Sequence, residues 1–490
     1  MEKIKLKMLL VVLPILLAAQ SIKAQVKVAD VFADNMVLQA DKKITVWGTA
    51  AMMESVTVAL NGVEVTVRAG INEKWQVELP PMKYGGPFDL NIYADDTLTL
   101  KNVMIGEVWL CAGQSNMRMS VKGALNPKQE IAAADYSDIR FFTVPQKGTT
   151  TLQNNVDADW QICSPETVGG KTAAGYYFAR KLSKELNVAV GIIDVSFGGA
   201  SILTFMDQAT MQSTVDTARI AMGNNGRSNI IKQRVIDWEN NGRKGNRPYL
   251  PQAIASLCYN AMVHPIIPFA NRGELWYQGE ANADRSDAYV HWFGDYITMM
   301  RDKFNNQEMP FYFVQLAGFE NQHNTNLPAE MWAEFRLAQE RCLQYPNTGI
   351  VTAMDIGEKD DIHPKNKQEV GLRLAMYALN QTYGKTDIIC KGPTISSIKQ
   401  GKGKVIITFD NCAKGLKTKE DKKEVLGFLA VLSDGKKVAL KGKIISKNEL
   451  MIKGKNITTL YYAYANYPIC NLYNSANLPA LPFKYYPNKK

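Results

Sequence analysis

The feature that most constrains the fold is an alternation of short apolar runs with helical segments between residues 104 and 385. Buried strands are expected at 108–111, 188–195, 275–277, 311–316 and 349–354. Apolar residues recur at helical spacing between them, at 173–186, 288–304, 328–342 and 366–379. Strands that alternate with helices predict an α/β domain with three layers around a parallel sheet.

The regions on either side of this domain have the sequence patterns of β structure. Two alternating runs at 56–60 and 63–67 flank Asn61-Gly62, which predicts a hairpin. Short strands and Gly–Lys turns return after residue 385. We therefore expect an N-terminal β domain (25–103), an α/β domain (104–385) and a C-terminal β region (386–490). Residues 205–250, rich in Asn, Gly and Arg, are expected to form an insertion over the α/β domain.

The first 24 residues resemble a secretory signal peptide. Lys3, Lys5 and Lys7 precede an apolar run from Met8 to Ala19, and Ala24 is a suitable last residue before cleavage. The run is shorter than the roughly 20 residues that a membrane span needs. We therefore expect an exported protein, periplasmic or extracellular, with no membrane span in the mature chain.

The net charge of +10 does not indicate nucleic-acid binding. Residues 385–456 carry 17 lysines against seven acidic residues, but no arginine. These lysines alternate with β-forming residues, as in Val438 to Ile444, which is typical of solvated strand faces and turns.

Cysteine and histidine usage gives no sign of a metal site. The seven cysteines include no C-x-x-C pair, and the chain has four histidines, so a structural zinc site is not expected. Because an exported chain can form disulfides, a bridge from Cys390 to Cys412 or to Cys470 remains open.

Polar residues follow several of the expected strands, at the sheet edge where parallel strands present catalytic groups. Ser115 lies in the stretch Gly113 to Met117, directly after the strand 108–111. A serine on such a turn, at a helix start, is exposed and close to backbone N–H groups. Met117 occupies the place of the second glycine of G-x-S-x-G, which disfavours the α/β-hydrolase fold.

Two further strand ends carry suggestive residues. Gly198-Gly199 follow the strand 188–195, and paired glycines let backbone N–H groups approach a substrate. Gln278 and Glu280 follow the strand 275–277, where buried polar groups are costly unless they are paired.

The last element is Asp360-Asp361-Ile362-His363-Pro364, between the strand 349–354 and the following helix. An aspartate three residues before a histidine can fold back onto the imidazole and stabilise the imidazolium that forms when a serine loses its proton. The alternative is an acidic cluster at a helix N-terminus. The joint occurrence of these elements at strand ends favours a hydroxyl–imidazole–carboxylate set.

Several stretches resemble the sialate O-acetylesterase family, within the SGNH (GDSL-like) hydrolases. They are GEVWLCAGQSNM (106–117), ELWYQGEANA (274–283), DIHPKNKQEVGLRLA (361–375), VFADNMVLQADKKITVWGTA (31–50) and NLYNSANLPALPF (471–483). The resemblance covers nearly the whole mature chain and implies a flavodoxin-like SGNH domain.

The resemblance also implies residue roles. Ser115 matches the nucleophile, His363 the general base and Asp360 the orienting acid, with Asp361 as the runner-up. The implied oxyanion hole is the N–H of Ser115, an N–H of Gly198 or Gly199, and the side chain of Gln278. Glu280 and Asn282 would brace that strand end. No metal or cofactor is implied.

The implied reaction is hydrolysis of an acetyl ester on a sugar, with sialic acid as the first candidate and xylan or another glycan as the alternative. The sequence departs from the family at Arg118, where an acid is usual, and at Ala200 to Phe205, where Thr, Glu and Trp are usual. Both changes concern the pocket wall. A non-catalytic glycan-binding protein is the alternative from another class.

Overall fold

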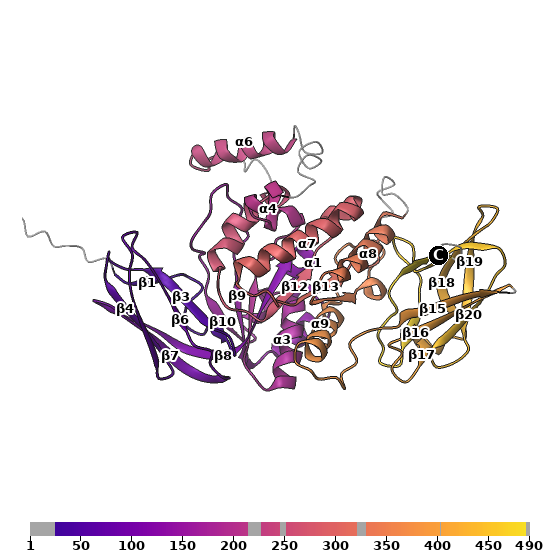
Figure 1. The fold of residues 1–490 in the computed structure, drawn as a ribbon, viewed down its shortest axis with the longest axis horizontal. Helices are drawn as coiled ribbons and strands as arrows, with labels where there is room; N and C mark the ends of the chain where they lie inside the picture. The colour runs from indigo at the N-terminus through magenta and orange to yellow at the C-terminus, as the bar shows by residue number, and fades with distance from the viewer. Residues whose placement is uncertain (1–24, 214–226, 246–250, 321–329, 402, 487–490) are drawn as a thin grey trace, which may run out of the picture.

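The computed structural model describes residues 25–213, 227–245, 251–320, 330–401 and 403–486. Figure 1 shows three parts along the longest axis: the N-terminal strands in indigo, an α/β centre, and the C-terminal strands in yellow. The expected signal peptide (1–24) lies outside the described residues. So do 214–226 and 246–250 of the expected insertion, which otherwise contributes the helices α4 (Gln208–Ser213) and α6 (Arg227–Asn240).

The centre is built on a sheet with the strand order β10-β9-β11-β8-β12-β13-β14. All neighbouring pairs along this path are parallel, except the antiparallel pair β10–β9 at one edge. The strands are β8 (Thr97–Gly113), β9 (Tyr136–Thr143), β10 (Trp160–Cys163), β11 (Val190–Asp194), β12 (Gly273–Tyr277), β13 (Phe311–Gln315) and β14 (Thr348–Thr352). The carboxyl ends of the parallel strands therefore meet at one edge, where a site is expected.

Helices pack on both faces of this sheet because each buried strand presents large side chains to both sides. On one face, Trp109 packs on Phe178 of α3 (Ala173–Leu186), and Tyr312 packs on Tyr377 of α9 (Lys367–Gln381). On the other, Trp276 packs on α7 (Ser286–Lys303), which contacts α8 (Met331–Arg341). A short helix near the start of this region is α2 (Pro127–Ala132). The mixed α/β class expected from the sequence is confirmed.

The strand β8 runs without interruption from the N-terminal region into the centre. Its first half pairs with β7 (Gly85–Tyr93) and β2 (Val37–Gln39), and its second half pairs with β11 and β12. The division expected between residues 103 and 104 falls inside this strand. The change of sequence pattern there therefore marks the point where one continuous strand becomes buried, and it does not mark a linker between domains.

The other N-terminal strands are antiparallel. They are β1 (Lys27–Val28), β3 (Ile44–Thr49), β4 (Ser55–Leu60), β5 (Val63–Arg68) and β6 (Lys74–Leu79). The expected hairpin is confirmed: Leu60 pairs with Val63, and both Asn61 and Gly62 have positive φ, as a two-residue hairpin turn requires.

The C-terminal region is an antiparallel sheet with the order β15-β16-β20-β19-β18-β21-β23, beside the pair β17–β22. The strands are β15 (Thr394–Gly401), β16 (Lys404–Asp410), β17 (Leu416–Thr418), β18 (Val425–Leu432), β19 (Lys437–Ile444), β20 (Glu449–Lys453), β21 (Ile457–Tyr462), β22 (Leu472–Asn474) and β23 (Phe483–Tyr485). Lys437, Lys441 and Lys443 of β19 are exposed, as expected for a solvated strand face. All seven cysteines are free thiols, so the bridges considered for Cys390 do not form.

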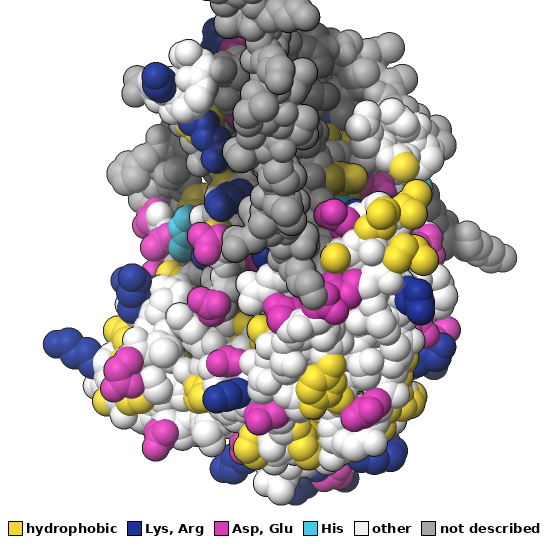
Figure 2. All heavy atoms as spheres, turned by 90° about the vertical axis from the view of Figure 1, so that its left-hand side faces the viewer, with side chains coloured by type: hydrophobic (Ala, Val, Ile, Leu, Met, Phe, Trp, Pro, Cys, Tyr) yellow, Lys and Arg dark blue, Asp and Glu magenta, His cyan; other side chains and the backbone are white. Residues whose placement is uncertain are grey.

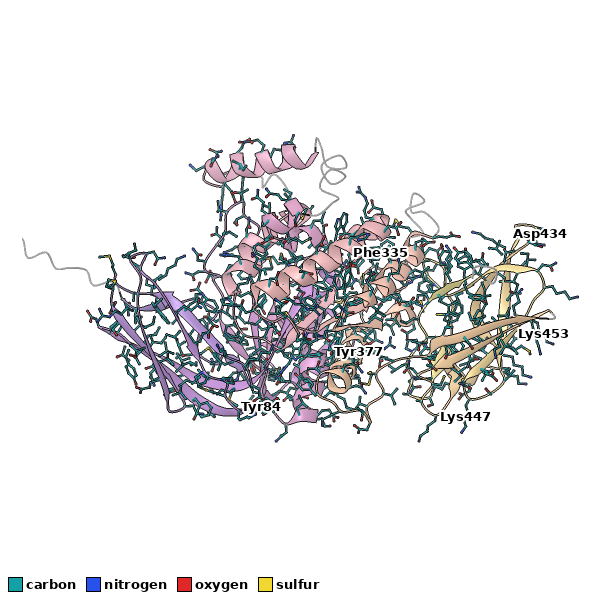
Figure 3. The ribbon with its side chains drawn as sticks, in the orientation of Figure 1. Tyr84, Phe335, Tyr377, Asp434, Lys447 and Lys453 are labelled. Atoms are coloured by element: carbon teal, nitrogen blue, oxygen red, sulfur yellow. The ribbon has the colours of Figure 1, made fainter. Side chains whose placement is uncertain are left out.

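Two buried ionic groups join the three parts. The Glu107 carboxylate of β8 accepts hydrogen bonds from Tyr84 and Gln39 of the N-terminal region and from Arg272 and Tyr383 of the centre. Figure 3 labels Tyr84 at this junction. The Arg336 guanidinium of α8 donates to backbone carbonyls of residues 465 and 466 in the C-terminal region. Loss of the Glu107 carboxylate or of the Arg336 guanidinium would leave buried polar atoms in the neighbouring part of the molecule without hydrogen-bond partners.

The surface over the N-terminal strands carries acidic and basic side chains that are interspersed (Figure 2). Within the part of the chain that the structure describes, no helix is long and apolar enough to cross a bilayer.

Candidate active site

Ser115 is the first residue of the short helix α1 (Ser115–Arg118), which follows the carboxyl end of β8. Gly113, the last residue of β8, has a φ of +127°, and a Cβ there would lie 2.2 Å from the carbonyl oxygen of Tyr277. Only glycine allows this close approach of β8 to β12. Gln114 donates its backbone N–H to the same carbonyl at 2.9 Å. These contacts fix Ser115 at the carboxyl edge of the central strand.

His363 lies in the loop between β14 and α9, and its Nε2 is 2.8 Å from Ser115 Oγ. The two residues are 248 positions apart in the sequence, so only the fold brings them together. A hydroxyl in hydrogen-bond contact with an imidazole is the pairing that a serine nucleophile needs with its general base.

Of the two neighbouring aspartates, Asp361 is the one that contacts the imidazole. Its Oδ1 is 3.7 Å from His363 Nδ1, and the same oxygen accepts the backbone N–H of His363 at 2.8 Å. Asp360 is exposed, and no hydrogen bond or ion pair joins it to His363 within the described residues. The structure therefore corrects the choice of Asp360 to Asp361, because a turn closed by the Asp361 carboxylate on the His363 N–H leaves the preceding side chain pointing into solvent.

Partial burial lowers the pKa of the His363 imidazole below its ordinary value of 6.5. The Asp361 carboxylate opposes this effect by raising the pKa, whereas the Lys367 ammonium lowers it further. His363 is consequently neutral at neutral pH and able to accept a proton.

The turn after β11 lies beside the nucleophile. A Cβ on Gly198 would lie 3.8 Å from Ser115 Cβ, and Gly199 has a φ of +71°, which favours glycine. No acceptor for the backbone N–H of Ser115 or of Gly198 is found in the described part of the chain. Two such donors, one on the nucleophile and one on a residue whose Cα lies beside it, suit an oxyanion that develops at Ser115.

The side chain of Gln278 is not available as an oxyanion donor. It is 0% exposed, and its amide nitrogen donates to Ala200 O at 3.0 Å and to Asn282 Oδ1 at 2.7 Å. Since both of its N–H groups are engaged, Gln278 braces the chain around residue 200. This corrects the expectation that Gln278 lines the oxyanion hole, which the sequence could not exclude because the partners of a buried amide depend on the fold.

Asn282 and Glu280, which were expected to brace this strand end, both make hydrogen bonds to neighbouring segments of the chain. Asn282 donates to Ser201 Oγ at 3.0 Å and accepts the N–H of Ile202 at 3.1 Å. Glu280 accepts a hydrogen bond from the side chain of Asn116, the residue next to Ser115. Burial raises the pKa of the Glu280 carboxyl.

Three residues of the site were not singled out from the sequence. Gln114 Oε1 accepts the N–H groups of Gly279 and Ala281, and so connects the β12 end to the nucleophile turn. Asn116 and Lys367 contact the loop of His363. All three lie within the motifs quoted above. The sequence did not single them out, because neither an amide nor a lysine at these positions indicates a particular role.

The arrangement is suited to acyl transfer through a serine. It contains a hydroxyl, an imidazole in contact with it, a carboxylate on the far side of the ring and two backbone donors. No group of three or more His, Cys, Asp or Glu side chains with metal-binding geometry is found in the described residues.

Comparison with known proteins gives a consistent family assignment. Residues 105–380 match the family model of the carbohydrate esterases described as sialic acid-specific acetylesterases. The sialate O-acetylesterase of Rattus norvegicus is 30% identical over 75% of this chain and 76% of its own length. The human enzyme of the same name is 27% identical over 96% and 95%.

A solved structure agrees over almost the whole chain. A carbohydrate acetylesterase from Xanthomonas citri superposes with a TM-score of 0.82 at 29% identity. The superposition covers 94% of this chain and 99% of that one, so the terminal β regions are common to both proteins.

Proposed function

The chain belongs to the carbohydrate esterase family of sialic acid-specific acetylesterases, and from this premise we propose that it removes O-acetyl groups from sialic acid through a Ser115–His363–Asp361 triad. Membership makes the protein a carboxylic ester hydrolase that acts on acetylated carbohydrate. The 2.8 Å contact between His363 Nε2 and Ser115 Oγ carries the proposed mechanism.

In the first half-reaction, His363 Nε2 takes the proton of Ser115 Oγ while the oxygen attacks the acetyl carbonyl. The oxyanion that forms accepts hydrogen bonds from the N–H groups of Ser115 and Gly198, and one such donor contributes about 3 kcal/mol in well-studied oxyanion holes. The tetrahedral intermediate collapses as His363 gives its proton to the sugar oxygen, which leaves as an alcohol. The acetyl group is then bonded to Ser115.

In the second half-reaction, water replaces the sugar. His363 takes a proton from the water as its oxygen attacks the acetyl carbonyl. The second intermediate collapses as His363 gives this proton to Ser115 Oγ, which restores both residues and releases acetic acid, which ionises to acetate. Asp361 stabilises the imidazolium in both halves. The 3.7 Å separation is longer than a hydrogen bond, as is common in enzymes without substrate, where catalytic contacts tighten on binding.

The fold and location that accompany this function are also part of the proposal. The central sheet with helices on both faces is an SGNH hydrolase domain in this view, flanked by β regions that pack on it. Residues 1–24 act as a signal peptide that directs the protein out of the cytoplasm.

The surroundings of Arg118 favour an acidic sugar. Arg118 lies one helical turn after Ser115, and its NH1 donates to the buried Asp194 carboxylate at 3.0 Å. Its side chain is 28% exposed, and no partner for its Nε or NH2 is found in the described residues. A guanidinium held in this way can offer its second edge to a carboxylate. Sialic acid carries a carboxylate, whereas the xylose backbone of xylan is neutral.

The test of the substrate is acetate release from O-acetylated sialic acid and from acetylated xylan at equal ester concentration. We expect the higher kcat/KM with sialic acid. A higher value with xylan would reassign the sugar and leave the triad intact. No acetate from any acetylated sugar would contradict the function as a whole, and binding of the same sugars without hydrolysis would favour a glycan-binding protein.

The pH profile distinguishes the two aspartates. The acid limb of kcat/KM for p-nitrophenyl acetate should lie below pH 6.5, because the base must be neutral and burial lowers the pKa of His363. Asp361→Asn should lower kcat/KM by about 10²-fold and move this limb to still lower pH, since Asp361 raises the pKa of His363. The matched variant Asp360→Asn should have a far smaller effect on both. The reverse order of effects would return the role to Asp360.

A further inference from the structure

The backbone on both sides of His363 is held by one pair of side chains. Asn116 Nδ2 donates to the carbonyl of Ile362 at 3.0 Å, and Lys367 Nζ donates to the carbonyl of Pro364 at 2.6 Å. Lys367 Nζ also donates to Asn116 Oδ1 at 2.7 Å, so the two side chains are joined. The carbonyl groups immediately before and after the imidazole are therefore connected to the residue that follows Ser115.

The stability of the fold does not account for this lysine. Its side chain is 0% exposed, and taking an ammonium out of water is unfavourable. Lys367 is also the first residue of α9, where the helix dipole disfavours a cation. The groups that compensate are the carboxylates of Glu280, Glu358 and Asp361 and the ring of Tyr277 at 5.5 Å.

The hydrogen bonds do not depend on the charge of the lysine. Burial lowers the pKa of Lys367 to about 7, so near neutral pH the neutral amine is populated as well as the ammonium. An amine has two N–H groups, which is enough for the two acceptors, Asn116 Oδ1 and Pro364 O. The hydrogen bonds that connect Asn116 and Lys367 to the His363 loop therefore persist whether the lysine is protonated or neutral.

The imidazole has little else to hold it in place. The side chain of His363 is 42% exposed, and its Nδ1 lies 3.7 Å from an Asp361 carboxylate oxygen, which is longer than a hydrogen bond. Its other contact is the reacting one, to Ser115 Oγ at 2.8 Å. A displacement of about 1 Å in such a contact can slow catalysis about 10²-fold.

We propose that Asn116 and Lys367 are positioning residues, which hold the backbone of the His363 loop at a fixed distance from Ser115. The inference rests on the proposed function and adds two residues to its machinery. Neither side chain is assigned a contact with substrate. Their effect is expected on the chemical steps, both of which use His363, and not on binding.

The experiment compares Lys367→Met, Asn116→Ala and the double variant in the full chain, with p-nitrophenyl acetate as substrate. Each single variant should lower kcat by about 10- to 100-fold while KM changes by less than about twofold, because geometry at the reacting atoms and not ground-state binding is lost. The double variant should be no slower than the slower single one, since the two side chains act as one unit. Lys365→Met, in the same loop but exposed, is the matched control and should keep the wild-type kcat.

The outcomes separate the inference from the proposed function. A folded Lys367→Met or Asn116→Ala enzyme with wild-type kcat would overturn the positioning role. A rise in KM as large as the fall in kcat would also overturn it, because substrate binding would then be affected. A Lys367→Met chain that fails to fold would also overturn it, because the lysine would then be required for the fold. Activity that survives in Ser115→Ala would instead remove the triad.

Discussion

Replacing Ser115 with alanine is expected to reduce hydrolysis of p-nitrophenyl acetate at least 10³-fold while the protein stays folded. In the proposed mechanism the covalent intermediate forms on Oγ, and without it the oxyanion donors and binding contacts leave a small residual rate. Ser115 makes its side-chain hydrogen bond to the half-exposed His363, so no buried group loses a partner. The melting temperature should therefore change by only a few degrees.

A fluorophosphonate probe gives an independent measurement of the same residue. The probe should label the wild-type chain once, on Ser115, and should not label Ser115→Ala. Ser397→Ala, on an exposed position of β15, is the control and should behave as wild type in both assays. Undiminished turnover in Ser115→Ala would remove the serine from the mechanism, and labelling at another serine would identify a different nucleophile.

Replacing Arg272 with methionine should lower the free energy of unfolding by about 3–5 kcal/mol, the usual effect of leaving a buried charge without its partner. Arg272 Nε and NH2 each lie 2.7 Å from an oxygen of Glu107, whose side chain is 0% exposed. The methionine keeps most of the apolar contact but leaves the carboxylate with the neutral donors Gln39, Tyr84 and Tyr383. The measurement is thermal unfolding by calorimetry.

Two further variants make this test specific to the junction. Arg285→Met removes an exposed ion pair with Asp284 and should change stability by less than about 1 kcal/mol. Adding Glu107→Gln to Arg272→Met should recover part of the loss, because the buried charge disappears with its partner. Equal effects of Arg272→Met and Arg285→Met would show that the Glu107 group does not hold the N-terminal strands to the centre.

The sequence predicted the elements that are strongly periodic and missed those that are not. The helix expected at 173–186 has the observed bounds of α3, and the helix expected at 366–379 corresponds to α9. The strands β9 and β10 were not expected. Their apolar runs are short, and β10 pairs only at the edge of the sheet, so local pattern gave little signal.

The candidate site shows the same division between local signal and tertiary contact. Ser115 and His363 were predicted because each follows an expected strand and lies in a stretch that resembles the family, and Gly198 because it belongs to a pair of glycines after a strand. Gln278 was assigned to the oxyanion hole by motif, whereas its side chain is committed to Ala200 and Asn282. Which atoms a buried amide bonds to depends on chain segments far away in sequence, and so cannot be read locally.

The sequence by itself determined the class of fold and the family, and it predicted Ser115 and His363 as site residues, because strand ends and motifs are local patterns. Tertiary structure decided the rest: that β8 continues from the N-terminal strands into the central sheet, that Asp361 rather than Asp360 faces the imidazole, and that Asn116 and Lys367 hold its loop. The physical reason is that hydrogen-bond direction and burial are properties of a packed environment. A one-residue difference such as 360 against 361 is set by how a turn closes on its own backbone, which sequence spacing does not specify.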